Sequence, residues 1–368
     1  MRMCELFDRY FARILDGEGV SWGAARALGS ALCRFGPMRT TVGSLTGSSE
    51  EGRGPRDVAG LAVPSKVGPM LLDFARCPDC YGTLSTQDDQ ALVCESCGET
   101  YPIVDGIPQL VGTKSAINTS EVETQDYVTD FYENLRYKLP WARAYHEHTL
   151  REMLALADVT GRVLDNGCGN GMFLERLVQD SRPGTQLIGT DISMGMLEHA
   201  KRRLTECGSA ISITQADACR LPFADDSFDL VFARGLLHHL PDPAAGAREM
   251  ARVLRPGGVV IALDPNRTLI SELPRRLLRG TSHFDEDHKN FTVRQMRRIL
   301  TPHLRVDEVH HVGYVAYPLL GFPDITNFGK VLPLGALAPS LMKLDDVLAR
   351  VPGVRALSWG LMVRAVAD

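Results

Sequence analysis

The sequence predicts an α/β protein whose main domain is a doubly wound, mostly parallel sheet, with a small β-rich unit before it. From about residue 161, apolar runs of strand length alternate with helical patterns, which is typical of βαβ units. A glycine-rich turn, VLDNGCGNG at Val163–Gly171, separates the first such run from the first helix. Two Cys-x2-Cys pairs precede this region, among short apolar segments and turn residues.

The bulk properties limit the class of protein. The chain has 368 residues, 44% of them hydrophobic and 23% charged, which is ordinary for a globular protein of about two domains. The formal charge of -5 argues against a dedicated nucleic-acid binder, which is usually basic in at least one domain. No run of 18 or more apolar residues occurs, so we expect no membrane span. The N-terminus carries early acidic residues and lacks a signal-peptide pattern, so we expect a cytoplasmic protein.

Residues 1–66 are expected to form an N-terminal extension and a linker. Residues 1–36 have apolar side chains at helical spacing, which favours one or two amphipathic helices, although a poorly ordered extension fits equally well. Residues 40–60 are rich in Gly, Ser and Thr, a composition typical of a flexible linker.

Residues 67–114 form the small β-rich unit, which holds four of the nine cysteines. They are Cys77, Cys80, Cys94 and Cys97. Two Cys-x2-Cys pairs at this spacing predict a tetrahedral structural zinc site, because four thiolates leave no open position for catalysis. A unit with so few apolar residues needs such a staple. Two disulfides are the alternative, and the spacing does not exclude an iron centre.

Residues 115–368 are expected to hold the sheet domain, which begins with a helical lead-in over residues 115–150. The predicted helices are Met172–Val178, Met196–Glu206 and Ala244–Leu254. The seven predicted strands, in chain order, are RVLDNG, QLIGTD, ISITQAD, FDLVFAR, VVIALD, LRVDEVHHVG and SWGLMVRAVA.

A long apolar insertion, about residues 314–356, separates the last two strands. Up to Met342 it contains only Asp324 and Lys330 as charged residues. Four prolines are expected to break any long helix here: Pro318, Pro323, Pro333 and Pro339. The insertion fits a lid over an apolar acceptor, an edge that contacts a membrane, a dimer surface or an additional helical layer.

Gly167, Gly169 and Gly171 follow a predicted strand and precede a predicted helix. Glycines in such a turn let the backbone bend sharply and approach a ligand beneath a helix N-terminus. Asp191 ends the next strand, where a carboxylate can accept both ribose hydroxyls. The dinucleotide pattern G-x-G-x-x-G is not met, because Met172 follows the third glycine.

Two further carboxylates favour an amino-acid-bearing nucleoside over a dinucleotide. Asp165, just before the glycines, can meet an ammonium group. Asp217 ends the third strand and can accept from an adenine amino group, with the Ala218 backbone amide beside it. One ligand would then contact three adjacent strands at their carboxyl ends, where open α/β sheets bind ligands. Taken alone, Asp217 also fits a helix cap or a turn.

In these segments the chain resembles the class I S-adenosylmethionine-dependent methyltransferases. The matching segments lie within residues 160–265 and are VLDNGCGNG, IGTDIS, QADACRLPFADDSFDLVFARGLLHHL and REMARVLRPGGVVIALD. The resemblance implies a Rossmann-like doubly wound seven-stranded sheet, with S-adenosyl-L-methionine as the cofactor. Asn166 departs mildly from the family, which more often has an apolar residue there.

The same resemblance assigns the cofactor contacts by position. The methionine part would contact Asp165, Gly167, Gly169 and Gly171, the ribose Asp191, and the adenine Asp217, Ala218 and Leu221. Ile192 would also contact the cofactor, and Arg234 would lie near the sulfonium.

The tail YPIVDGIPQLV makes the cysteine unit similar to short zinc-ribbon proteins that partner and activate tRNA and protein methyltransferases. The resemblance implies a packing, stabilising or substrate-guiding module, here fused within one chain.

Three histidines are candidates for a general base, since an acceptor hydroxyl must lose a proton. His238 and His239 lie in LLHHL after the fourth strand, a common and often structural feature of the family. His283 lies in HFDEDH with Asp285 and His288, a segment that also fits a solvated loop, the lining of a substrate pocket or, less readily, a metal site.

Two acceptor classes compete. The acidic charge and the insertion favour a small, apolar or lipid-like metabolite of natural-product or quinone type, and the core also resembles methyltransferases of those kinds. The alternative is an rRNA or tRNA base, because a ribbon before the domain resembles rRNA guanine methyltransferases, although the YPIVDGIP tail departs from their ribbon. Eight basic residues could hold phosphates: Arg267, Arg275, Arg276, Arg279, Lys289, Arg294, Arg297 and Arg298.

A third interpretation is a non-catalytic scaffold that has kept the fold and binds the cofactor. Fold alone does not determine function, but the complete set of glycines and carboxylates counts against this interpretation.

Overall fold

The structure, a computed structural model, describes residues 69–87, 90–113, 115, 136, 138–206, 211–268, 270–272, 290–323 and 327–368. Residues 57–368 form one compact unit, so the predicted ribbon and the predicted sheet domain share one body. The predicted extension and linker, as well as the loop with His283, Asp285 and His288, lie outside the described residues.

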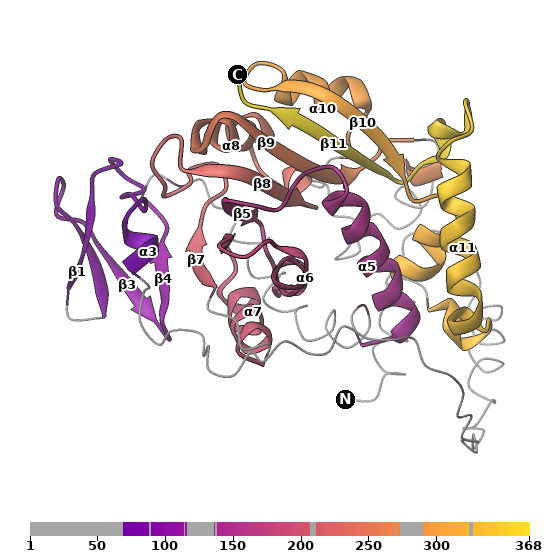
Figure 1. The fold of residues 1–368 in the computed structure, drawn as a ribbon, viewed down its shortest axis with the longest axis horizontal. Coiled ribbons are helices and arrows are strands. Elements are labelled where there is room, and N and C mark those ends of the chain that lie inside the picture. The colour runs from indigo at the N-terminus through magenta and orange to yellow at the C-terminus, as the bar shows by residue number, and fades with distance from the viewer. Residues whose placement is uncertain are drawn as a thin grey trace, which may run out of the picture. The chain divides into compact units, whose positions relative to one another are not determined.

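A doubly wound sheet forms the centre of this unit (Figure 1). Its seven strands are β5 (Arg162–Asn166), β6 (Gln186–Asp191), β7 (Ser212–Ala216), β8 (Phe228–Arg234), β9 (Leu254–Pro265), β10 (Arg305–Val312) and β11 (Gly360–Val366). They lie in the order β7-β6-β5-β8-β9-β11-β10, which confirms the predicted seven-stranded fold. The first five run parallel, and β11 is antiparallel to both of its neighbours. The strand order reverses between β5 and β8, the point where such sheets bind ligands.

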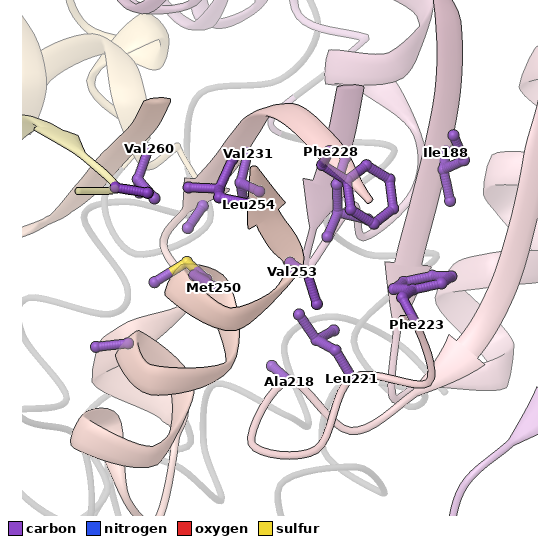
Figure 2. Packing of buried hydrophobic residues seen from close by; sticks show 14 of the residues in the cluster. Ile188, Ala218, Leu221, Phe223, Phe228, Val231, Met250, Val253, Leu254 and Val260 are labelled. Atoms are coloured by element: carbon purple, nitrogen blue, oxygen red, sulfur yellow. The ribbon is translucent and has the colours of Figure 1, made fainter. Parts of the chain in front are cut away.

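Helices cover both faces of the sheet because the central strands are buried on both sides. The helices are α5 (Pro140–Leu154), α6 (Met172–Asp180), α7 (Met194–Glu206), the short η2 (Leu237–His239), α8 (Pro243–Val253) and α10 (Val293–Leu300). One buried cluster joins α5, α6 and α7 to the sheet. A second cluster joins α8, α10 and the ribbon to it. In Figure 2, Phe223 and Phe228 of this second cluster lie near Val253 of α8.

The cysteine unit is a small β-ribbon that continues the main sheet. It contains α3 (Pro69–Leu72), β1 (Leu84–Gln87), β2 (Ala91–Cys94), β3 (Thr100–Val104) and β4 (Ile107–Leu110). Strand β4 pairs in parallel with β7, with Gln109 opposite Gln215 and Leu110 opposite Ala216. The eleven strands therefore form one continuous sheet, and the ribbon is an extension of the sheet domain along its β7 edge.

The insertion contains η3 (Tyr317–Gly321), η4 (Phe328–Lys330), α11 (Leu334–Leu348) and η5 (Val354–Leu357). The expectation that the prolines break any long helix is wrong at Pro339, which lies inside the fifteen-residue α11. A proline there removes one intrahelical N–H, but α11 is held from outside. Leu334 and Ala338 are buried in a cluster with Tyr145 of α5, so tertiary packing overrides the local preference.

A buried carboxylate also anchors α11. Oxygen atoms of Asp345 accept the backbone N–H groups of Tyr314 and Val315, each at 2.7 Å, and that of Ala316 at 3.1 Å. One face of the insertion thus forms the additional helical layer named among the alternatives. Among the described residues, no helix combines the length and apolar character that crossing a membrane requires.

Candidate active site and metal centre

The carboxyl ends of five adjacent parallel strands carry the polar residues of the candidate site. They are Asp165 in β5, Asp191 in β6, Asp217 directly after β7, Arg234 in β8 and Asp264 in β9. Four of these were predicted from the sequence, and Asp264 was not. Because parallel strands end at one edge of a sheet, the fold gathers all five on the ligand-binding edge.

The glycine turn connects β5 to α6 and takes a backbone conformation that other residues rarely adopt. Gly167, Gly169 and Gly171 have φ angles of 78°, 52° and 78°, in the left-handed region that favours glycine. A Cβ at Gly167 would lie 2.9 Å from Leu236 Cδ1, and one at Gly171 would lie 2.9 Å from Ala200 Cα. A Cβ at Gly169 would meet no atom within 4 Å. Gly169 therefore faces open space that a ligand can enter.

Asp165 is a buried carboxylate with an incomplete set of partners. It is 1% exposed, and its Oδ2 has no hydrogen-bond partner. Burial raises the pKa of Asp165, the charge of Arg234 lowers it and that of Asp191 raises it, and the result is a pKa of about 7. An unpartnered carboxylate oxygen in the interior is costly, and an incoming cationic group would relieve that cost. This chemistry fits the ammonium group of an amino-acid-bearing nucleoside.

Asp191 ties the glycine turn to the next strand. Its Oδ2 accepts the Gly169 N–H at 2.8 Å, and its Oδ1 accepts the Ser193 N–H at 3.0 Å. Desolvation raises the pKa of Asp191, whereas these two N–H groups lower it. The carbonyl of Ile192 accepts from Nε2 of Gln215 on β7 at 2.8 Å, which fixes the backbone beside the carboxylate.

The loop after β7, predicted to frame an adenine, is a buried turn. Oδ1 of Asp217 accepts the Cys219 N–H at 2.8 Å, so one oxygen serves the turn that was the alternative role of this residue. Ala218 and Leu221 lie in the buried cluster that Figure 2 shows. The Leu221 N–H donates to Oε2 of Glu249 at 2.9 Å. The loop therefore has a fixed shape before any ligand arrives.

Arg220, within the same loop, contacts the ribbon. Its guanidinium donates to the backbone carbonyl of Pro78, and to that of Asp79 at 2.8 Å. The guanidinium carbon also lies 5.1 Å from the ring centre of Tyr81, within cation–π range. The Tyr81 hydroxyl donates to Glu249 at 3.3 Å. The loop after β7 and the Cys77–Cys80 turn are thus joined through one side chain.

His238 and Asp264 form a hydrogen-bonded pair at the ends of β8 and β9. Nδ1 of His238 lies 2.8 Å from Oδ1 of Asp264, which also accepts the His238 backbone N–H at 3.1 Å. Burial raises the pKa of Asp264 to about 7, although its backbone N–H partners and the charge of His239 oppose this shift. With Nδ1 donating to the carboxylate, Nε2 is the ring nitrogen that can accept a proton.

The other candidate bases are placed less favourably. The ring centre of His239 lies 3.9 Å from that of His238, so His239 packs against the pair, and its charge lowers the pKa of Asp264. His283 lies outside the described residues.

The four predicted metal ligands converge. All four Sγ atoms lie within 4.8 Å of one another, with Cys77 and Cys97 3.7 Å apart and Cys80 and Cys94 3.4 Å apart. Tetrahedral zinc with bonds of about 2.3 Å places its sulfur ligands about 3.8 Å apart, so the donor set fits zinc. All four cysteines are free, which contradicts the alternative of two disulfides.

Backbone N–H groups and a tyrosine hydroxyl contact these sulfur atoms. The N–H groups of Ser96 and Cys97 each lie 3.4 Å from Sγ of Cys94. The Tyr101 hydroxyl lies 3.0 Å from Sγ of Cys77 and donates to Asp79 at 2.9 Å. Such outer contacts hold metal ligands in a fixed orientation.

Sequence reasoning missed three residues of the site: Asp264, Arg220 and Gln215. The rule that found Asp191 could have found Asp264, because both are carboxylates at the end of an apolar strand. No local signal identifies Arg220 or Gln215, since their partners lie about 140 residues and 23 residues away in the chain.

Known proteins match both parts of the chain. Residues 164–262 match the family described as methyltransferase domain, and residues 69–106 match the family described as Trm112p-like protein. The methyltransferase GfsG of Streptomyces halstedii is 42% identical over 105 residues, 28% of this chain and 37% of that protein. The ubiquinone/menaquinone biosynthesis C-methyltransferase UbiE of Desulfotalea psychrophila is 40% identical over 104 residues, 28% of this chain and 41% of that protein.

A longer match is an uncharacterized chloroplastic methyltransferase of Arabidopsis thaliana, 26% identical over 258 residues, 63% of this chain and 73% of that protein. The chain spans only 30% to 50% of the length of the first five curated relatives that it matches. Together, the two matched families and the fold show that this chain contains a class I, S-adenosylmethionine-dependent methyltransferase domain joined to an N-terminal Trm112p-like module.

Proposed function

We propose that this protein transfers a methyl group from S-adenosyl-L-methionine to a small, apolar or lipid-like acceptor, and that a structural zinc ion stabilises its ribbon. The observation that carries the proposal is the buried Oδ2 of Asp165, which has no partner, beside a glycine that faces open space. A carboxylate and a glycine cradle together suit the two ends of an amino acid.

The residues of the strand ends would divide the binding work. Asp165 would pair with the ammonium of the methionine part, and Asp191 would accept from the ribose hydroxyls. Asp217 and Ala218 would frame the adenine. When bound, the cofactor supplies an activated methyl group; the protein supplies position and exclusion of water. Arg234 would stabilise Asp165 in its charged form, because its charge lowers the pKa of that carboxyl.

His238 would act as the base for an acceptor that must lose a proton. The bond from Nδ1 to Asp264 at 2.8 Å orients the ring, so that Nε2 would take the proton. Asp264 would stabilise the imidazolium that forms, as an orienting carboxylate does for a catalytic histidine. Asp264 would thus be a positioning residue.

The acceptor class follows from three features. The chain carries a net charge of -5. Its insertion follows the carboxyl end of β10 and exposes apolar side chains. Several matched relatives are named quinone methyltransferases. A reduced, quinone-type ring would offer an ionisable hydroxyl and a nucleophilic ring carbon.

Calorimetry and a transfer assay test the proposal. We expect S-adenosylmethionine to bind and Asp191→Ala to weaken that binding, since a charged hydrogen-bond acceptor is worth about 1.5–3 kcal/mol. We expect transfer of labelled methyl to demethylmenaquinol, with kcat reduced about 10²- to 10⁴-fold in His238→Ala and unchanged in the exposed control His303→Ala. A chain that binds no cofactor, or a transfer confined to RNA, would refute the enzyme or the acceptor assignment respectively.

The metal assignment has a test of its own. Metal analysis should find one zinc per chain in the purified protein and a loss of that zinc in Cys94→Ser. Cys219→Ser is the matched control, because Cys219 is free and lies outside the ribbon. A zinc content that is absent, or equal in the two variants, would contradict the assignment.

A further inference from the structure

Exposed apolar side chains concentrate on one part of the molecule. Among the described residues, nine large apolar side chains are exposed, and seven of these lie between residues 331 and 357. We call these seven the apolar face of the insertion: Val331, Leu332, Leu337, Leu344, Val347, Val351 and Leu357. Val331 is 75% exposed and Val347 58%. Single apolar residues on a surface are ordinary, whereas a concentration marks a contact surface.

The face has a definite geometry on α11. At about 100° per residue, Leu337, Leu344 and Val347 fall within about 80° of one another around the helix axis. Leu334 and Ala338 are buried against α5 and lie on the adjacent side of the helix, about 60° or more around the axis from these three residues. Helix α11 is therefore apolar on two sides, and only one of these sides is covered by the described part of the chain.

The charge around this face has one sign. Lys330, Lys343, Arg350 and Arg355 are all exposed, and none forms an ion pair with another described residue. The acidic residues between 327 and 357 are Asp345 and Asp346. Asp345 is buried and accepts backbone N–H groups, and Asp346 pairs with His148 at 3.1 Å. Because the Asp346 side chain is 37% exposed, the exposed charge of this segment consists of four cations and one carboxylate and is mainly positive, although the chain carries -5 overall.

We propose that the apolar face of the insertion and its four cations bind the surface of a lipid bilayer that contains anionic headgroups. Apolar side chains flanked by lysine and arginine are the pattern of helices that lie in the interface of a membrane. A second copy of the chain fits less well, because a twofold dimer would bring the same cations of both copies together.

The position of the face suggests what a membrane contact would do for catalysis, and this part of the inference alone rests on the proposed function. The insertion begins at the carboxyl edge of the sheet, where the carbonyl of Gly313 accepts the Trp359 N–H at 2.8 Å and that of Trp359 accepts the Asn266 N–H at 2.7 Å. Asn266 follows Asp264 by two residues. A bilayer contact there would bring lipid-dissolved acceptors to the side of the molecule that holds the candidate base.

Co-sedimentation of the full chain with vesicles tests the contact without any activity. We expect binding to phosphatidylcholine vesicles that contain phosphatidylglycerol, weak binding to pure phosphatidylcholine, and a decrease at high salt. Removal of two cations in Lys343→Ala with Arg350→Ala should weaken partitioning about 25-fold, at about fivefold for each cation. Leu344→Ser with Val347→Ser should weaken it about tenfold.

Two controls lie elsewhere: one also removes two exposed cations, and the other also replaces an exposed valine by serine. They are Arg297→Ala with Arg298→Ala on the exposed side of α10, and Val104→Ser in the ribbon, and both should bind as the unchanged protein does. Equal partitioning of all variants would overturn the proposal. A dimer that Leu344→Ser with Val347→Ser dissociates, without vesicle binding, would also overturn it and assign the face to a second copy. Vesicle binding in a protein that binds no S-adenosylmethionine would uphold the contact and refute only the proposed function.

Discussion

Replacing Gly169 by alanine should separate cofactor binding from folding. Gly169 has a φ of 52°, and a Cβ there would meet no protein atom within 4 Å. The substitution should therefore lower the free energy of unfolding only by the cost of a left-handed conformation in a non-glycine residue, about 1–2 kcal/mol. In a chain of this size, each kcal/mol of lost stability lowers Tm by at most about 2–4 °C. The new methyl group, however, would occupy the space proposed for the methionine part, which should cost about 1–3 kcal/mol, or about 5- to 150-fold in Kd.

Gly171 supplies the matched comparison. It has the same need for a left-handed conformation, with a φ of 78°, but its Cβ would lie 2.9 Å from both Cα and Cβ of Ala200. Gly171→Ala should therefore lose about 2–5 kcal/mol of stability, from strain together with overpacking.

Thermal denaturation and titration calorimetry with S-adenosylmethionine measure the two effects. Gly169→Ala should melt near the unchanged protein and bind weakly, whereas Gly171→Ala should melt well below it. An unchanged Kd in a folded Gly169→Ala protein would refute the assignment of the open space to the cofactor. Equal losses of Tm in both variants would refute the packing argument.

Three further predictions concern protonation, the ribbon contact and the metal. The pKa of Asp165 is about 7 without ligand, and an ammonium group needs the ionised form. Calorimetry should therefore show S-adenosylmethionine binding about tenfold weaker at pH 6 than at pH 8, with proton release on binding. A similar pH dependence in Asp165→Asn would contradict this. Arg220→Ala should lower the free energy of unfolding by about 2 kcal/mol, because it removes the charged donor to the carbonyls of Pro78 and Asp79, and it should weaken cofactor binding. Arg182→Ala is a surface control. An equal calorimetric Kd in the two variants would argue against a coupling between the ribbon and the cofactor site. A chelator that removes the zinc proposed for the ribbon should lower Tm and reduce cofactor affinity, because β4 extends the sheet at β7. An unchanged melting curve by circular dichroism would count against a structural metal.

Local patterns were sufficient for much of the fold. The seven predicted strands correspond to β5 through β11. Most are apolar runs bounded by turn residues or a glycine, whereas β10 carries mostly polar residues that are exposed or partly exposed. The helix predicted at Ala244–Leu254 is observed as α8 at Pro243–Val253, with Asp242 accepting the Ala244 N–H as its cap. The carboxylates after β5, β6 and β7 were also visible, since a polar residue at the end of a buried strand stands out against its apolar run.

Non-local contacts decided the remainder. The pairing of β4 with β7 joins residues more than 100 positions apart, and a strand pattern carries no record of its partner. Pro339 was misjudged for a related reason, because the packing of Leu334 and Ala338 against α5 outweighs the local cost of a proline.

The sequence by itself therefore determined the strands, the glycine turn, the cysteine ligand set and three of the strand-end carboxylates, because these depend on periodicity and spacing along the chain. Only the tertiary structure decided that Asp264 orients His238 and that Arg220 joins the loop after β7 to the ribbon. It also decided that the insertion leaves apolar side chains exposed beside positive charges. The physical reason is that hydrogen-bond partners and burial depend on which segments the fold brings together, and residues far apart in the chain supply them.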